Sequence, residues 1–196
     1  MKDLINNFDI IIVNPKNNGN IGSVCRAMKT MGFTSLVVVG KKNIIDNESE
    51  AMAVHGFDIL KIAKIFEELE DAVKNSTIIA GITRRRGKKR KYFSISPEEL
   101  AERSLQNNKG RVSLVFGNEE AGLSDKDLSL CNISVYIPSS DKFPSLNLSH
   151  AVQIICYSIF RNYTKGNFPD YTPIVKEKMD NLVTSICSSL KFYSLF

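Results

Sequence analysis

A short segment near the N-terminus, Asn20–Ala27, carries polar side chains at a spacing that could bind an anion. Asn20, Ser23 and Arg26 recur every three residues, so they share one face of a helix while apolar residues form the other. Arg26 would lie close to the free backbone N–H groups at the start of that helix, and together they could clamp a phosphate. The alternative, which the spacing alone favours, is a surface arginine on an amphipathic helix.

Two later segments place polar groups where buried strands end. Phe116–Leu123 holds a carboxylate, Glu119, between two glycines, which permits close approach of the backbone to a ligand. Ser145–Ser149 starts a helix whose polar side carries Ser145 and Asn147. The alternatives are a tight turn with solvated acids for the first segment and a serine that only caps a helix for the second.

The positive charge of the chain is concentrated in one run. The stretch Arg84–Lys91 holds seven basic residues, and without it the net charge of +5 would become slightly negative. A local basic patch on such a body indicates that a polyanion docks there, and a solvated loop is the alternative. The run lacks interleaved aromatic residues until Tyr92 and Phe93, so it predicts contact with a nucleic-acid backbone more than with bases.

The elements that must position these residues alternate between strands and helices. The expected strands are short apolar runs rich in β-branched residues, each followed by a turn-rich segment. This alternation predicts an α/β domain with a largely parallel sheet, which binds ligands beyond the carboxyl ends of its strands. We expect strands at 9–13, 35–39, 77–80, 112–116 and 133–137, and helices at 20–31, 48–54, 59–66, 145–160 and 174–191 and from Pro97 onward, with Asn20 and Ser96 as N-caps and Gly32 as a C-terminal stop.

Several enzyme classes and site types are excluded. The chain lacks G-x-G-x-x-G after its first strand, a P-loop motif and a G-x-S-x-G elbow, which argues against dinucleotide-dependent enzymes, P-loop NTPases and α/β-hydrolases. The four cysteines are far apart, which indicates free thiols in a reducing cytosol, and His55 and His150 lack zinc-ligand spacing. We find no signal-peptide core and no apolar stretch of about 18 residues, so we expect a cytoplasmic protein without a metal or a membrane span.

Taken in order, the three polar segments resemble the three motifs of the SpoU/TrmH family of RNA methyltransferases. Asn20–Ala27 resembles the first motif, N-x-G-S-x-x-R-A, and Leu114–Leu123 resembles the second, L-V-F-G-x-E-x-x-G-L. The third motif, I-P followed by S-L-N-L-S-x-A-V, is similar to Ile137-Pro138 and Ser145–Val152. The resemblance covers about residues 8–162, and three motifs in order at fitting spacing are a specific signal.

The resemblance implies a SPOUT-type α/β fold, in which a mostly parallel sheet is flanked by helices and the C-terminal part forms a trefoil knot, a topology that is otherwise very rare. Residues 1–163 would form the methyltransferase domain and residues 164–196 a short C-terminal helical extension. The family dimerises through the knot region, which places Arg26 of one subunit near the cofactor of the other. That cofactor is S-adenosyl-L-methionine, held largely by backbone groups. By position, the cofactor-binding residues would be Ile82, Thr83, Arg84, Gly117, Ile137, Ser145 and Leu146.

The implied activity is 2′-O-methylation of a ribose in tRNA. The chain is most similar to the TrmJ subgroup, through Asn14-Pro15, Arg26–Phe33 and the basic run, and this points to the anticodon-loop nucleotide at position 32. Members of that subgroup carry a longer helical extension, so the departure here puts the exact position in doubt. The alternatives are ribosomal RNA or another tRNA position as substrate, a non-catalytic RNA-binding homologue, and a nucleotide-dependent enzyme of another α/β class.

The resemblance assigns the chemistry to residues of all three motifs. A guanidinium with a pKa above about 12 is a poor general base, so we expect Arg26 to bind the adjacent phosphate and stabilise the developing alkoxide. Glu119 is expected to hold Arg26 or the loop at Ser145 in place. The expected catalytic residues are Arg26, Asn20, Glu119, Ser145 and Asn147, and the expected RNA-binding residues are Arg26, Arg85, Arg86, Lys88, Lys89, Arg90 and Lys91.

Overall fold

The computed structural model describes residues 5–84, 94–106, 110–164 and 176–192 and divides the chain into two compact units. The first unit is Met1–Lys165 and the second is Gly166–Phe196. The second unit contains one described helix, α8 (Lys176–Phe192), with Leu182, Val183 and Ile186 exposed. No helix among the described residues is long and apolar enough to cross a membrane.

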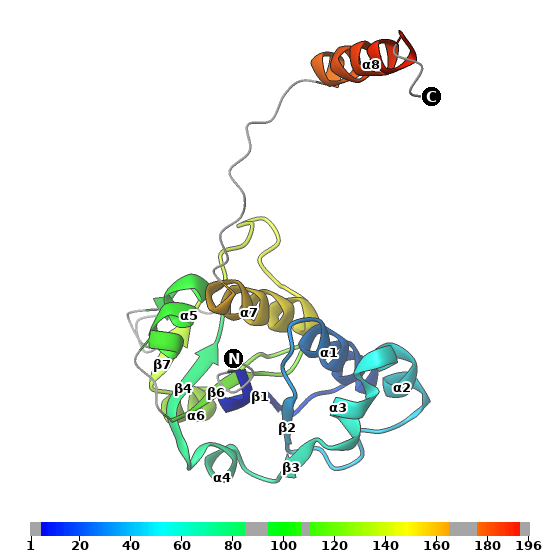
Figure 1. Ribbon diagram of the computed structural model, residues 1–196. Helices are drawn as coiled ribbons and strands as arrows, with labels where there is room; N and C mark the ends of the chain where they lie inside the picture. Colours follow the sequence, from blue (N-terminus) through cyan, green and yellow to red (C-terminus); the bar gives the residue numbers. More distant parts are fainter. Residues whose placement is uncertain (1–4, 85–93, 107–109, 165–175, 193–196) are drawn as a thin grey trace. The chain divides into compact units, whose positions relative to one another are not determined.

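The first unit is built on a parallel sheet of seven strands in the order β3-β2-β1-β6-β4-β7-β5 (Figure 1). Every described strand pair is parallel, as the alternation of elements predicted. β1 lies inside the sheet, where it pairs with β2 on one side and with β6, a hundred residues later, on the other, so that Phe8 pairs with Val112. The strands are β1 (Phe8–Val13), β2 (Ser35–Val39), β3 (Lys64–Phe66), β4 (Ser76–Ile82), β5 (Ser94–Ile95), β6 (Arg111–Phe116) and β7 (Ile133–Val135).

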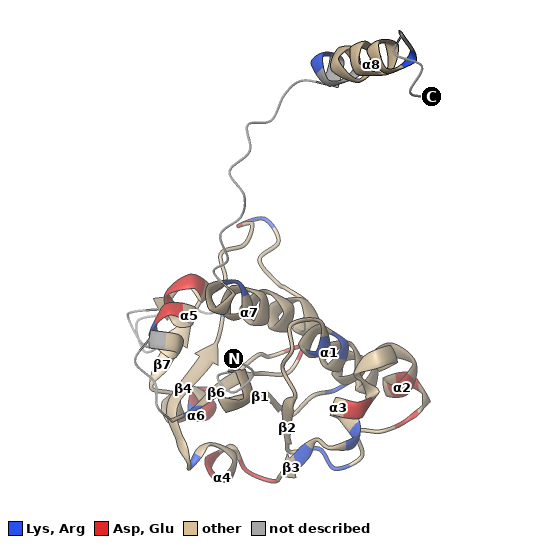
Figure 2. Ribbon diagram, viewed as in Figure 1, with Lys and Arg blue, Asp and Glu red and all other residues tan. Residues whose placement is uncertain are grey.

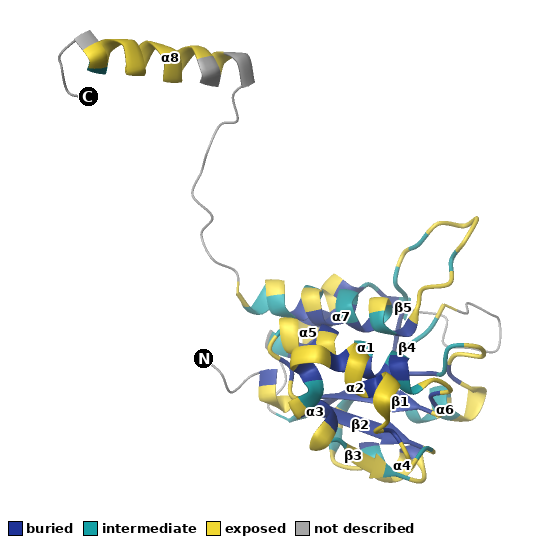
Figure 3. Ribbon diagram, turned by 90° about the vertical axis from the view of Figure 1, so that its right-hand side faces the viewer, coloured by how far each residue is buried: buried dark blue, intermediate teal, exposed yellow. Residues whose placement is uncertain are grey.

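Helices cover both faces of the sheet, and this explains why its inner strands are mostly apolar. Side chains alternate across a strand, so Ile10 and Ile12 pack in one core layer while Ile11 and Val13 pack in the other. The first layer contains α1, α2, α3, α5 and α7, and the second contains α4 and α6; Figure 3 shows the buried strands between them. The helices are α1 (Asn18–Thr30), α2 (Asn47–Ala53), α3 (Phe57–Lys61), α4 (Leu69–Val73), α5 (Pro97–Gln106), α6 (Asp125–Leu130) and α7 (Leu148–Tyr163), with short 3-10 turns at Ile5–Asn7 and Val54–Gly56.

The start of α1 differs from the sequence prediction in a way that matters for the site. The N-cap is Asn17, whose side-chain oxygen accepts a hydrogen bond from the backbone N–H of Asn20 at 2.9 Å, so the prediction that Asn20 caps the helix was wrong. The side chain of Asn20 is therefore available for other partners. The expected stop is confirmed, because the helix ends at Thr30 and Gly32 follows with a positive φ of 77°.

Two other predicted helices have different bounds. The segment 59–66, expected to be one helix, is the end of α3 followed by β3, because pairing with β2 sets Ile65 opposite Val38. The helix expected from Ser145 begins at Leu148 with Asn147 as its N-cap, which leaves Ser145 in the preceding loop. The strand expected at 133–137 ends at Val135, and β5, α4 and α6 were not predicted. The N-cap at Ser96 is confirmed by its hydroxyl, which accepts from the backbone N–H of Glu99 at 3.2 Å.

The close packing of α1 against α2 depends on Gly22. A β-carbon at this position would lie 2.2 Å from the backbone carbonyl oxygen of Ser49, which cannot swing away as the end of a side chain could. Alanine is the better helix former by about 1 kcal/mol. We nevertheless expect Gly22→Ala to lower the free energy of unfolding by about 1–3 kcal/mol, measured by urea denaturation.

The neighbouring substitution Ser23→Ala is the matched control for Gly22. Ser23 lies in the same helix, is half-buried and makes no hydrogen bond with the described residues through its side chain. It should change the free energy of unfolding by no more than about 0.5 kcal/mol. A Gly22→Ala protein as stable as the wild type would mean that α2 can move away from α1 without cost.

Candidate active site

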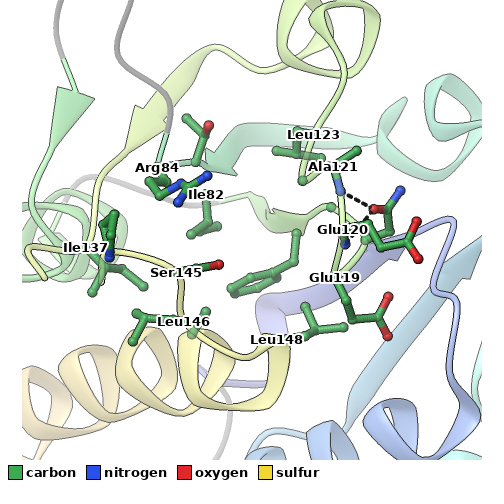
Figure 4. Close-up of a pocket in the computed structure, with 17 residues that line it drawn as sticks. Ile82, Arg84, Glu119, Glu120, Ala121, Leu123, Ile137, Ser145, Leu146 and Leu148 are labelled. Carbon is green, nitrogen blue, oxygen red and sulfur yellow. Dashed lines mark hydrogen bonds between the residues drawn. The ribbon is translucent and has the colours of Figure 1, made fainter. Parts of the chain in front are cut away.

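A pocket opens beyond the carboxyl ends of β4, β6 and β7, where a parallel sheet is expected to bind a ligand (Figure 4). The hollow has a volume of about 820 Å³, part of which is open to solvent. All seven residues expected to contact the cofactor line this one pocket: Ile82, Thr83, Arg84, Gly117, Ile137, Ser145 and Leu146.

The wall of the pocket is mostly apolar, with a few polar groups. In Figure 4, Ile82, Arg84 and Ile137 lie on one side of the pocket and Leu146 and Leu148 lie on another. Ser145 lies between these two sides. The chain reaches this position because β4 and β7 pair as far as Ile82 and Val135, after which both leave the sheet. Such a surface suits a flat heterocycle between apolar side chains, with its polar edges bound by main-chain groups.

The turn after β6 brings the backbone to the pocket surface. The Asn118 side-chain oxygen accepts from the backbone N–H groups of Glu120 at 3.1 Å and Ala121 at 2.7 Å, which closes the turn (Figure 4). A β-carbon at Gly117 would lie 2.0 Å from the carbonyl carbon of Gly122, so only glycine allows this folding of the chain. The main chain of the turn, with the glycine that precedes it, therefore forms part of the pocket wall.

A chain of hydrogen bonds links one residue from each of the three polar segments. The amide N–H of Asn20 donates to Glu119 at 2.8 Å, and the amide N–H of Asn147 donates to the side-chain oxygen of Asn20 at 3.2 Å. Glu119 also accepts from the backbone N–H groups of Lys16 at 3.0 Å and Asn17 at 3.4 Å. These contacts fix the start of α1 and the start of α7 to the turn that borders the pocket.

Glu119 is half-buried and held as a carboxylate. Burial opposes its charge, but the N–H of Lys16 and the amide of Asn20 outweigh this effect, so the pKa of Glu119 lies below its usual value. Glu119 was expected to hold Arg26 or the loop at Ser145. No contact with Arg26 is found, and the link to the loop is indirect, through Asn20 to Asn147.

Arg26 lies apart from the pocket of its own chain. Its side chain is exposed on the third turn of α1, does not line the pocket, and makes no hydrogen bond or ion pair with the described residues. Figure 2 shows the basic segments of α1 and, separately, a basic segment on the loop that precedes α7. Any partner of this guanidinium would therefore come from another molecule, either an anionic ligand or the pocket of a second copy of the chain.

The other expected site residues fall into three groups. Glu119 and Ser145 line the pocket, whereas Asn20 and Asn147 act from behind it through hydrogen bonds. Asn17 was missed, although an asparagine just before a helix is a recognisable capping signal, and its side chain also donates to Glu48 at 3.2 Å. The residues of the basic run that were expected to bind RNA lie outside the described part of the chain: Arg85, Arg86, Lys88, Lys89, Arg90 and Lys91.

Metal binding has no support among the described residues, where no group of three or more His, Cys, Asp or Glu side chains is placed to hold an ion. None of the four cysteines forms a disulfide: Cys25, Cys131 and Cys156 are buried and Cys187 is exposed. Burial raises the pKa of the Cys25 thiol to about 12, so it is protonated and unreactive at neutral pH.

Comparison with known proteins gives consistent matches. Residues 7–157 match the model of the SpoU rRNA Methylase family. Over 165 residues the chain is 40% identical to the tRNA (cytidine-2'-O-)-methyltransferase TrmJ of Methanocaldococcus jannaschii, which covers 83% of this chain and 71% of that protein. The crystal structure of TrmJ from Z. mobilis ZM4 superposes with a TM-score of 0.74 at 26% identity, over 96% of this chain and 81% of the other.

A more distant structure shares the fold. The SpoU methyltransferase AviRb from Streptomyces viridochromogenes, solved in complex with the cofactor AdoMet, has a TM-score of 0.66 at 21% identity, over 81% of this chain and 61% of that one. The chain spans 61–71% of the length of the first curated relatives that it matches.

Proposed function

The chain belongs to the SpoU rRNA methylase family, and we propose that it transfers the methyl group of S-adenosyl-L-methionine to a ribose 2′-oxygen of tRNA. The observation that carries the proposal is that all seven expected cofactor residues line one pocket. The hydrogen-bonded chain of Glu119, Asn20 and Asn147 borders this pocket. The relatives named as tRNA 2'-O-methyltransferases support tRNA as the substrate class.

The residues present fit the cofactor. The pocket offers apolar side chains for the adenine ring and main-chain groups of the turn after Gly117 for polar edges. That turn folds back on itself so closely that a β-carbon at Gly117 would clash with the backbone of Gly122. Ile82, Thr83, Ile137 and Leu146 would hold the cofactor from the remaining sides. When bound, it supplies a methyl group already activated by a positive sulfur, so the protein has only to align and polarise.

The protein must stabilise the attacking oxygen, because a ribose hydroxyl is a weak acid. We assign this to Arg26, which is exposed and therefore able to bind the phosphate next to the ribose and the negative charge that develops on the 2′-oxygen. Glu119, Asn20 and Asn147 are positioning residues that hold the starts of α1 and α7 beside the pocket. Ser145 lines the pocket and would contact the cofactor or the ribose directly.

A homodimer would bring these parts together. Arg26 does not line the pocket of its own chain, so we propose that Arg26 of one protomer lies beside the pocket of the other. The dimer would form through a trefoil knot made by the C-terminal part of the methyltransferase domain, residues 1–163. The remaining residues, 164–196, would form a helical extension, and the run Arg84–Lys91 would bind the RNA backbone in the cytoplasm.

Within tRNA, we propose the anticodon-loop nucleotide at position 32, with another tRNA position or ribosomal RNA as the alternative. The relatives named TrmJ are tRNA 2'-O-methyltransferases for cytidine and, in some cases, uridine or adenosine, which supports a nucleotide in tRNA.

The decisive experiment is a methylation assay. Purified protein is incubated with labelled S-adenosylmethionine and unmodified bulk tRNA, and the RNA is digested to nucleosides. We expect 2′-O-methylcytidine or 2′-O-methyluridine. Cofactor binding without any product on tRNA would favour ribosomal RNA as the substrate. The absence of both cofactor binding and product would refute the proposal.

A further inference from the structure

The loop between β7 and α7 holds an exposed aromatic residue directly before three residues that line the pocket. Phe143 is 78% exposed, more than any other large hydrophobic side chain in the part of the chain that the structure describes. The loop projects from the body of the first unit in Figure 1, and Figure 3 shows it as largely exposed. Pro144, Ser145 and Leu146 follow directly and line the pocket, so the loop that carries Phe143 leads straight into the pocket wall.

The turn that carries this ring is held by its own hydrogen bonds. The backbone N–H of Phe143 donates to the Ser140 carbonyl at 3.2 Å, and the hydroxyl of Ser139 donates to the Pro144 carbonyl at 3.1 Å. The backbone N–H of Lys142 donates to the Ser140 hydroxyl at 3.3 Å. Pro144 further restricts the backbone of the residue before it. The ring is therefore presented to solvent by a built turn, although burying a phenyl group would be favourable.

We propose that Phe143 stacks on an unpaired base next to the ribose that is methylated. The proposal rests on the proposed function, because a 2′-oxygen that reaches the pocket brings its own base and its neighbours to the rim. Aromatic side chains at such rims stack on splayed-out bases. Lys142, which is exposed and precedes Phe143 in the chain, adds a positive charge for the adjoining phosphate.

This role defines the substrate as an RNA loop or single strand. A base inside a continuous duplex has both faces covered by its neighbours and offers none to Phe143. A nucleotide in an open loop can turn one face toward the ring while its ribose enters the pocket. Among RNAs of the same sequence, the protein should therefore select the unpaired form.

The test compares four proteins: wild type, Phe143→Ala, Phe143→Leu and Phe143→Tyr. The probes are a stem-loop RNA and the same sequence annealed to its complement, with affinity measured by fluorescence anisotropy. We expect the alanine and leucine variants to bind the stem-loop about tenfold more weakly and to lose the preference over duplex, whereas tyrosine keeps both. S-adenosylmethionine affinity should be unchanged in all four. Ile62→Ala is the matched control, because Ile62 is 68% exposed and lies outside the pocket lining.

Three outcomes would overturn the stacking role. Wild-type affinity in Phe143→Ala would show that the ring contacts no RNA, and full recovery with leucine would show a general apolar contact. A change from dimer to monomer in Phe143→Ala, seen by analytical ultracentrifugation, would make the ring an interface residue. A wild-type protein that binds S-adenosylmethionine but no RNA would instead contradict the proposed function itself, whatever the variants do.

Discussion

Replacing Arg26 with alanine should reduce the rate of methyl transfer to tRNA by about 10²–10³-fold, the effect of removing one donor aimed at developing negative charge. S-adenosylmethionine affinity and thermal stability should remain near wild type, because the Arg26 side chain is exposed and makes no contact with the described residues. Initial rates, equilibrium cofactor binding and a thermal melt measure these three quantities separately.

Two further variants sharpen this prediction. Arg26→Lys should reduce the rate of methyl transfer nearly as much as Arg26→Ala does, because a lysine cannot form the two parallel hydrogen bonds of a guanidinium with a phosphate. Lys29→Ala is the matched control, since it removes a charge one turn later on α1 and breaks only an exposed ion pair with Asp58. Near-wild-type turnover in Arg26→Ala would contradict the assignment.

The dimer arrangement can be tested with the same variant. Arg26→Ala and Ser145→Trp should each be inactive, the first for lack of the guanidinium and the second because the indole fills the pocket. When the two proteins are mixed, denatured and refolded together, mixed dimers should regain activity if one protomer supplies Arg26 to the pocket of the other. Mixed dimers as inactive as their parents would place Arg26 at the pocket of its own chain, or outside catalysis.

Removing the Glu119 carboxylate should lower kcat by about 10–100-fold. Glu119→Ala leaves three donors without their acceptor, the backbone N–H groups of Lys16 and Asn17 and the amide of Asn20, and hydrogen bonds to a charged group are worth about 1.5–3 kcal/mol each. The starts of α1 and α7 then lose their common anchor. Steady-state kinetics should show a larger change in kcat than in the KM for S-adenosylmethionine, because Glu119 acts through Asn20.

A conservative variant separates positioning from general damage. Glu119→Gln keeps one acceptor oxygen and should recover part of the loss, while Glu102→Ala, on the exposed side of α5, should behave as wild type. The folded protein lowers the pKa of Glu119. The carboxylate therefore stabilises the fold at any pH above the ordinary pKa of a glutamate, about 4.3, and this stabilisation is lost as the pH falls toward the lower pKa of the folded state. The difference in free energy of unfolding between wild type and Glu119→Gln should therefore shrink only below a pH of about 4.3. Equal kcat values in wild type and Glu119→Ala would refute the positioning role of Glu119.

The sequence alone predicted the inner strands of the sheet and the edge of the sheet at which a pocket opens. β1, β2 and β6 are largely apolar runs rich in β-branched residues and buried on both faces, a pattern typical of the inner strands of a parallel sheet. The loops after such strands gather at one edge of a parallel sheet, which is why Ile82, Gly117 and Ser145 meet in one pocket.

What the sequence did not predict depends on tertiary neighbours. β5 has two residues and β3 three, and both are strands only because an adjacent strand offers its edge. Choosing between Asn17 and Asn20 as the N-cap of α1 required the position of Glu119 in the fold. Glu119 accepts a hydrogen bond from the Asn20 amide, although the two residues lie about a hundred positions apart in the sequence. Single-sequence patterns do not contain that information.

The position of β1 between β2 and β6 in the sheet also has a consequence for synthesis on the ribosome. Its second edge pairs with β6, so it remains open from the moment β2 folds against β1 until β6 has left the exit tunnel. At 5–20 residues per second, that interval lasts roughly 4–15 s. During it the nascent chain exposes an apolar, unpaired strand edge of the kind that seeds aggregation. Slow translation or a scarcity of chaperones should therefore reduce the yield of this protein more than changes to its mature surface do.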